Sequence, residues 1–163
     1  NYTSLNRNSI GIEISNRGHR FGYQSFSKKQ IKSIINLSKY LIKKYNIKKE
    51  NILGHSDIAF ERKIDPGEKF PWEFLSKNRI GKWHTLNINK LKKIRKKRTD
   101  KSEKIIFFKL LSKIGYSVKN NKYIKQTKLI KNFQRHFRQK LINGIIDQET
   151  LLIAKKLSKF KKK

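Results

Sequence analysis

The chain has 163 residues, enough for one ordinary domain or for a small domain with a second unit beside it. Its 42 Lys and Arg residues outnumber 11 Asp and Glu residues and give a formal net charge of +31. This charge favours polyanionic partners such as nucleic acid, anionic lipid or acidic polymers, although much of it can equally be solvated surface decoration. The absence of Cys excludes disulfides and thiolate metal sites, and no apolar run approaches the roughly 20 residues of a membrane span.

Three zones follow one another along the chain. Residues 1–86 have the glycine-punctuated, mixed sequence of an α/β unit, residues 87–103 are dominated by Lys and Arg and are typical of a linker, and residues 104–160 have helical apolar spacing. The chain begins at Asn1 and contains no Met, so we expect it to be a fragment or a processed product.

The first zone opens with a predicted strand and a predicted helix. Ile10, Ile12 and Ile14 alternate with small or polar residues, which is the period of a strand. Ser27 and Gln30 have the spacing of a helix capping box, and apolar residues recur behind them at helical spacing.

A second strand is predicted over residues 51–54, a short apolar segment that ends at His55. The order strand, helix, strand predicts an α/β fold with a βαβ-like unit. Such a unit places Glu13, on the open face of the first strand, and His55 near the same edge of a sheet.

The residues after this strand carry a candidate metal site. Asp65 begins an Asp-Pro-Gly turn ten residues after His55, and zinc binds imidazole nitrogen and carboxylate oxygen readily. Lys63 lies beside the same turn, where its charge can stabilise an anion developing on an attacked carbonyl. Glu13 is placed to take a proton from a zinc-bound water. From spacing alone, a hydrogen-bonded structural His, an ordinary turn Asp and a solvent-facing Glu remain open alternatives.

A succession of motifs goes further than spacing. These motifs closely resemble, in order, those of the amidase-2 type of zinc-dependent N-acetylmuramoyl-L-alanine amidase, which is related to peptidoglycan recognition proteins. They are Ser9-Ile10-Gly11-Ile12-Glu13, Asn16-x-Gly18-His19-x-x-Gly22-Tyr23-x-x-Phe26, Gly54-His55-Ser56-Asp57-Ile58-Ala59, Arg62-Lys63-x-Asp65-Pro66-Gly67, Phe70-Pro71-Trp72 and Ile80-Gly81-x-Trp83.

The resemblance implies a mixed sheet flanked by helices, incomplete at its N-terminal side, and a zinc site made by two His and one Asp. It also implies hydrolysis of the amide between the lactyl group of N-acetylmuramic acid and L-alanine of the stem peptide by a zinc-activated water. By motif, His55 and Asp65 match zinc ligands, Glu13 matches the catalytic Glu, and Lys63 matches the lysine that stabilises the tetrahedral intermediate.

The chain departs from this family at one position. The family's first zinc His lies upstream of the Ser-Ile-Gly-Ile-Glu segment, and no residue of this chain matches it. An alternative function is therefore a catalytically incomplete protein that binds peptidoglycan or muropeptides without cleaving them.

The last zone predicts an all-α unit of three helices, over residues 105–113 and 125–137 and behind an N-cap at Asp147. Phe133-Gln134 and the later Gly144-x-x-Asp147-x-x-Thr150 resemble the small peptidoglycan-binding domain that commonly follows such amidases. We do not expect specific nucleic-acid binding, because the aromatic residues lie at core spacing rather than along the basic run. The resemblance implies peptidoglycan or muropeptide partners, at the periplasm or cell envelope or, alternatively, in cytoplasmic muropeptide recycling.

Overall fold

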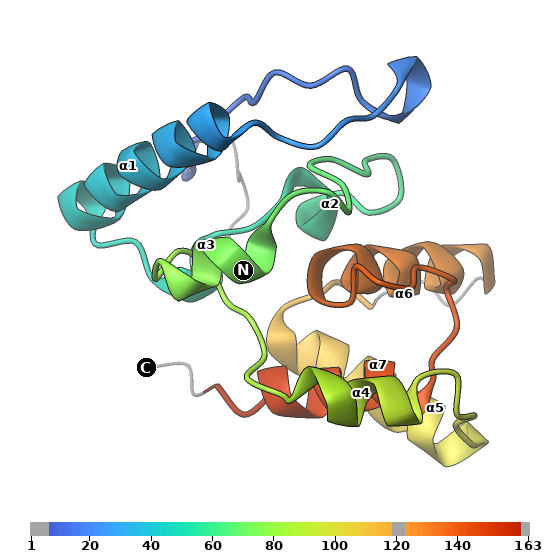
Figure 1. Cartoon of the computed structure of the whole chain (residues 1–163). Helices are drawn as coiled ribbons and strands as arrows, with labels where there is room; N and C mark the ends of the chain where they lie inside the picture. The colour runs from blue at the N-terminus through green and yellow to red at the C-terminus, as the bar shows by residue number, and fades with distance from the viewer. Residues whose placement is uncertain (1–6, 119–122, 161–163) are drawn as a thin grey trace.

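The structure is a computed structural model that describes residues 7–118 and 123–160. Seven α-helices and two short 3-10 helices occur within these ranges (Figure 1). The α-helices are α1 (Lys28–Tyr45), α2 (His55–Ile58), α3 (Trp72–Lys77), α4 (Ile88–Ile94), α5 (Lys101–Ile114), α6 (Tyr123–Phe137) and α7 (Gln148–Leu157), and the 3-10 helices are η1 (His19–Phe21) and η2 (Lys49–Asn51).

The predicted sheet is wrong for this structure. The described residues contain no strand, and the sole bridge among them joins Arg98 to Asp147. Residues 9–14 run without regular structure, and Ile10 and Ile12 are 50% and 40% exposed. Alternation of apolar side chains specifies two faces, but a strand also needs a neighbour that pairs its N–H and C=O groups. No described segment supplies that neighbour. The second predicted strand is likewise η2 followed by irregular chain.

The predicted helix after residue 27 is confirmed as α1. The Ser27 hydroxyl accepts a hydrogen bond from the Gln30 amide at 3.2 Å, and the Gln30 side chain accepts one from the Ser27 amide at 2.9 Å. This capping box satisfies two amides that have no partner inside the helix. The helix ends at Asn46, whose left-handed backbone stops its propagation.

The three helices predicted in the last zone are present as α5, α6 and α7. Helix α5 starts at Lys101, earlier than predicted, because Asp100 and Glu103 form a second capping box. Asp147 caps α7 by accepting a hydrogen bond from the Thr150 amide at 2.9 Å. Part of the basic segment is also ordered, since residues 88–94 form α4 behind an Asn87 cap. None of the described helices is long and apolar enough to cross a membrane.

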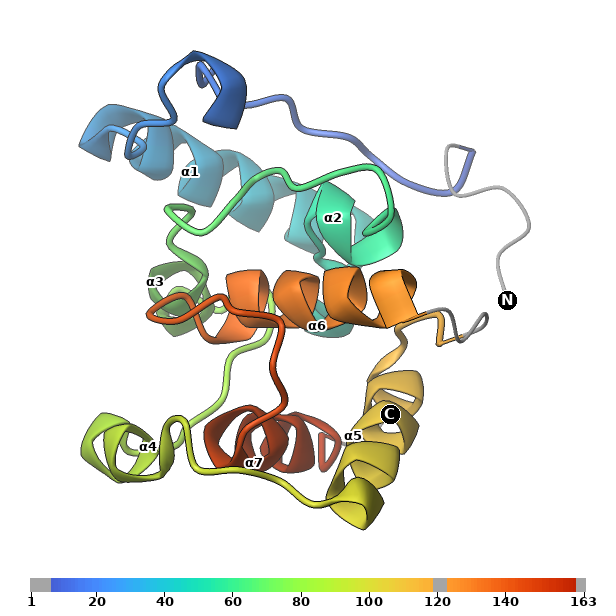
Figure 2. The ribbon, with the colours of Figure 1, turned by 90° about the vertical axis from the view of Figure 1, so that its right-hand side faces the viewer.

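Helix α6 lies at the centre of the molecule. Figures 1 and 2 show α2 and α3 along one side of it and α4, α5 and α7 on the other. Two apolar clusters follow this arrangement: one joins α1 to α3, and the larger one joins α4, α5, α6 and α7. Trp83 packs against both clusters, so the amidase-like and helical zones share one continuous interior.

The marks of the predicted peptidoglycan-binding unit have structural roles here. The fully buried side chain of Gln134 accepts hydrogen bonds from the amides of Asn143 and Gly144 and donates one to the carbonyl of Ile145. Gly144 has a φ of 76°, and a Cβ atom there would lie 2.8 Å from Thr127. These residues therefore shape the turn that leads from α6 to α7.

Candidate active site

The segment from Gly54 to Asp65 folds back on itself and brings His55 and Asp65 together. Gly54 precedes α2 and packs so closely on Pro66 that a Cβ atom there would lie 2.8 Å from the proline ring. The amide of Ser56 donates to the carbonyl of Asp65 at 3.0 Å, which joins the two ends of the segment. The sequence-predicted pair thus meets, although no sheet edge brings it together.

The two side chains lie at hydrogen-bonding distance, which is also close to the spacing of two ligand atoms on one zinc ion. His55 Nδ1 and Asp65 Oδ2 are 3.0 Å apart, and the side chains are 45% and 56% exposed. Two ligand atoms of a tetrahedral zinc ion lie about 3.3 Å apart when each is about 2.0 Å from the metal. These two residues therefore fit zinc as a pair. Among the described residues, no three His, Cys, Asp or Glu side chains come close enough together to hold a metal ion.

Lys63 and Glu13 differ in how firmly they are placed. Lys63 is half-buried, and its amide donates to the carbonyl of Ala59 at 2.9 Å, so its backbone belongs to the folded-back segment. Glu13 is exposed in the irregular segment before η1 and has no hydrogen bond or ion pair within the described ranges. The described contacts bring Glu13 to neither His55 nor Asp65.

The loop that contains η1 packs onto the turn after Asp65. The Tyr23 hydroxyl donates to the carbonyl of Pro66 at 2.7 Å and accepts from the amide of Lys69 at 3.0 Å. Burial raises the pKa of Tyr23, so its hydroxyl keeps the proton that it donates. His19 stacks on Tyr23 with ring centroids 4.2 Å apart, and its Nε2 lies 3.0 Å from Glu68. These contacts fix the turn that carries Asp65.

Asp57, two residues after His55, is the centre of a buried polar network. Its Oδ2 accepts hydrogen bonds from the Gly54 amide at 2.8 Å and from His136 Nδ1 at 2.7 Å. Its Oδ1 accepts from the Tyr116 hydroxyl at 2.7 Å and from the Asn132 amide group at 3.3 Å. Burial alone would raise the pKa of Asp57, but the charge and hydrogen bonds of these donors hold it below its usual value.

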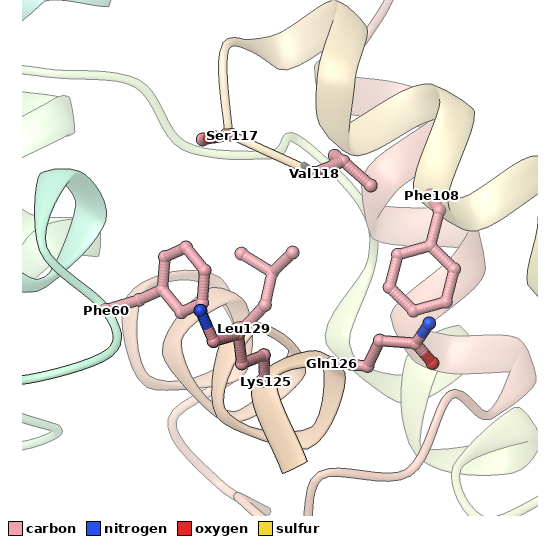
Figure 3. A pocket seen from close by; sticks show the side chains of 7 residues that line it. All are labelled: Phe60, Phe108, Ser117, Val118, Lys125, Gln126 and Leu129. Atoms are coloured by element: carbon pink, nitrogen blue, oxygen red, sulfur yellow. The ribbon is translucent and has the colours of Figure 1, made fainter. Parts of the chain in front are cut away.

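Further contacts hold the segment after Asp57 against α6. Phe60 lies against Lys125 and Leu129 of α6 across a crevice of about 10 Å³, too small for more than one water molecule (Figure 3). Lys128 donates to the carbonyl of Glu61 at 3.0 Å, and the Lys125 ammonium lies 3.2 Å from the Glu61 carboxylate. These contacts between the segment after Asp57 and α6 were not predicted from the sequence, although Asn132 and His136 recur at helical spacing among apolar residues.

Comparison with known proteins shows which family this chain resembles. Residues 1–68 match the family described as N-acetylmuramoyl-L-alanine amidase. The N-acetylmuramoyl-L-alanine amidase AmiD of Escherichia coli is 40% identical over 162 residues, which cover 95% of this chain and 58% of AmiD. The chain is related to the N-acetylmuramoyl-L-alanine amidases over most of its length. It spans less than two thirds of AmiD.

A second relative and two solved structures give similar results. The 1,6-anhydro-N-acetylmuramyl-L-alanine amidase AmpD of Haemophilus influenzae is 41% identical over 66 residues, 40% of this chain and 34% of AmpD. The structure of Escherichia coli AmiD with the substrate anhydro-N-acetylmuramic acid-L-Ala-D-gamma-Glu-L-Lys superposes with a TM-score of 0.77 at 38% identity, covering 91% of this chain and 60% of that one. AmpDh3 from Pseudomonas aeruginosa superposes with a TM-score of 0.70 at 27% identity, covering 84% and 55%.

The amidase family match ends before the residues whose side chains bond to Asp57. His55, Asp57, Lys63 and Asp65 all lie within residues 1–68. Tyr116, Asn132 and His136 lie beyond it, within the part that also aligns with AmiD. The residues that hold the candidate site therefore come from both zones of this chain.

A larger cavity, of about 350 Å³, lies elsewhere in the chain. Trp83, His84 and Arg138 are among its lining residues, and none of its lining residues belongs to the segment from Gly54 to Asp65. Burial lowers the pKa of His84, whose Nε2 lies 3.2 Å from the carbonyl oxygen of Phe137. The candidate site is therefore defined by its convergent side chains and not by this cavity.

Proposed function

We propose that the protein hydrolyses the amide between the lactyl group of N-acetylmuramic acid and L-alanine of the stem peptide. The observation that carries this proposal is the 3.0 Å approach of His55 Nδ1 to Asp65 Oδ2, within the part of the chain that matches the amidase family. The two side chains are 45% and 56% exposed, so a substrate can reach them.

Zinc is the cofactor that these two side chains fit. His55 and Asp65 would hold it, and when bound it supplies Lewis-acid polarisation of a water and of the scissile carbonyl. Lys63, on the same folded-back segment, is the residue proposed to stabilise the negative charge that develops on the attacked carbonyl oxygen. Glu13 is the proposed proton acceptor, in the exposed segment that precedes η1.

The proposed substrates are muropeptides, either within peptidoglycan or released as anhydro-muropeptides. The support is the solved complex of Escherichia coli AmiD, whose ligand is an anhydro-N-acetylmuramic acid peptide. The helical zone, residues 104–160, is proposed to assist binding to the wall, where the net charge of +31 favours anionic polymers. We propose the cell envelope as the place of action, with cytoplasmic muropeptide recycling as the alternative.

A cleavage assay tests this function. The chain is incubated with anhydro-N-acetylmuramyl tripeptide, with added zinc or with a chelator, and release of the free tripeptide is followed by mass spectrometry. We expect zinc-dependent release that is lost in His55→Ala and in Asp65→Ala. Release that persists in both variants would contradict the site. Binding of the muropeptide without any cleavage would instead identify a peptidoglycan-binding protein.

A further inference from the structure

One face of α6 is polar and is turned toward the segment that carries the candidate site. Its side chains recur every three or four residues, the spacing of one helix face. Each of them contacts a residue between Asp57 and Phe70. They are Lys125, Lys128, Asn132, Arg135 and His136, followed by Gln139 just after the helix.

The opposite face of α6 belongs to the core of the helical zone. Ile130 and Phe133 are buried there among residues of α5 and α7. Helix α6 therefore contacts two parts of the molecule. One face packs in the core of the helical zone, and the other holds the segment that follows Gly54.

His136 is the best-fixed member of the polar face. It is 4% exposed, and its ring stacks on Trp72 at 4.0 Å and on Phe137 at 3.9 Å. An ionised carboxylate only accepts hydrogen bonds, so His136 Nδ1 donates to Asp57. The ring stacking leaves the imidazole little freedom to turn away from this bond.

Asp57 connects His136 to the candidate site. The same oxygen that accepts from His136 accepts from the amide of Gly54, the residue immediately before His55. One residue further on, the Ser56 amide is bonded to the carbonyl of Asp65. A shift of the Asp57 carboxylate would therefore move the backbone on both sides of His55 relative to Asp65.

We propose that His136 is a positioning residue which, through Asp57, fixes His55 against Asp65. This inference rests on the proposed function for its catalytic consequence, but the geometry that it describes is independent of the metal. The helical zone is then a working part of the amidase site and not only a unit for wall attachment. Groups that orient metal ligands in this way commonly change metal affinity by about 10- to 100-fold when they are removed.

Two substitutions separate the hydrogen bond of His136 from its packing. His136→Phe keeps an aromatic ring between Trp72 and Phe137 but removes the donor to Asp57. His136→Asn restores an N–H donor near the position of Nδ1 but removes the ring. Ile130→Val is the matched control, because it loosens α6 from its other face without touching Asp57.

Two measurements on the whole chain give the result. Hydrogen exchange of the Gly54 amide reports its bond to Asp57 directly, without metal or substrate. Competition with a chelator gives the zinc dissociation constant. We expect His136→Phe to speed exchange at Gly54 at least about 10-fold and to weaken zinc binding about 10- to 100-fold. His136→Asn should recover part of both losses, and Ile130→Val should leave both near the parent values.

The outcomes distinguish this inference from the proposed function. Unchanged exchange and unchanged zinc affinity in His136→Phe would overturn the positioning role. Equal acceleration in His136→Phe and Ile130→Val would also overturn it, because loss of helical stability would then explain both. If the parent chain binds no zinc, the proposed function fails, and the exchange at Gly54 alone still decides whether His136 positions the segment.

Discussion

The guanidinium of Arg138 and the carboxylate of Asp147 lie 2.6 Å apart and are almost completely buried. Arg138 also approaches Glu149 at 3.3 Å, and Glu149 is held by Arg95 at 2.6 Å. Burial would raise the pKa of Asp147, but hydrogen bonds from Thr150 and the charge of Arg138 hold it below its usual value. The start of α7 is thus fixed by a buried ionic cluster.

Arg138→Met should strongly destabilise the chain. The substitution keeps the length of the side chain but leaves Asp147 buried without its counter-ion, which costs about 3–5 kcal/mol. Urea unfolding measures the loss. Lys77→Met is the control, because Lys77 forms an exposed ion pair with Glu73 and should lose at most about 0.5 kcal/mol. Similar losses in the two variants would contradict the structural role of the cluster.

Gly67→Ala should cost more than Gly22→Ala. Both glycines have left-handed backbones, with φ of 85° and 83°, so both variants carry the strain of about 1–2 kcal/mol. A Cβ atom at Gly67 would lie 2.5 Å from the Tyr23 hydroxyl oxygen, whereas at Gly22 it would meet nothing within 4 Å. The additional loss, about 1–3 kcal/mol for a half-buried hydroxyl displaced from its hydrogen bonds, comes from the contact with Tyr23. Equal unfolding free energies for the two variants would refute that contact.

His84 should make the chain less stable as the pH falls. Its pKa is lowered in the folded state, so the unfolded chain binds the proton first, near pH 6.5. Stability from the neutral form is present above pH 6.5 and is lost below it, by at most about 1.4 kcal/mol per pH unit. His84→Gln keeps a donor near Nε2 and does not titrate. The difference in unfolding free energy between parent and variant should therefore change between pH 7.5 and pH 5.5. A constant difference would show that His84 is not the source of the pH dependence.

Lys63→Met should lower turnover more than it lowers binding. If Lys63 stabilises the negative charge of the transition state, its loss should reduce kcat about 10²- to 10³-fold with little change in KM. Arg62→Met is the neighbouring control, since Arg62 is exposed and carries the same charge. Steady-state cleavage of anhydro-N-acetylmuramyl tripeptide gives both constants. A matching loss in the Arg62 variant would point to general attraction of the anionic substrate instead.

Features that depend on neighbouring residues could be predicted from the sequence. The capping box at Ser27 and Gln30 and the cap at Asp147 satisfy amides within three residues, so they can be read without knowing any neighbour in space. The family motifs also predicted that His55 and Asp65 share a site, and the two side chains do lie together because one short segment that closes on itself carries both. Their role as metal ligands stays a prediction.

Features that depend on distant partners could not be predicted in this way. The alternation of Ile10, Ile12 and Ile14 predicted a strand, but pairing depends on a neighbour that no described residue provides. No role for Asp57 was predicted from its motif, because its partner His136 lies 79 positions away in the sequence. A buried carboxylate is stable only where donors converge on it, and that convergence comes from the docking of α6 against α2.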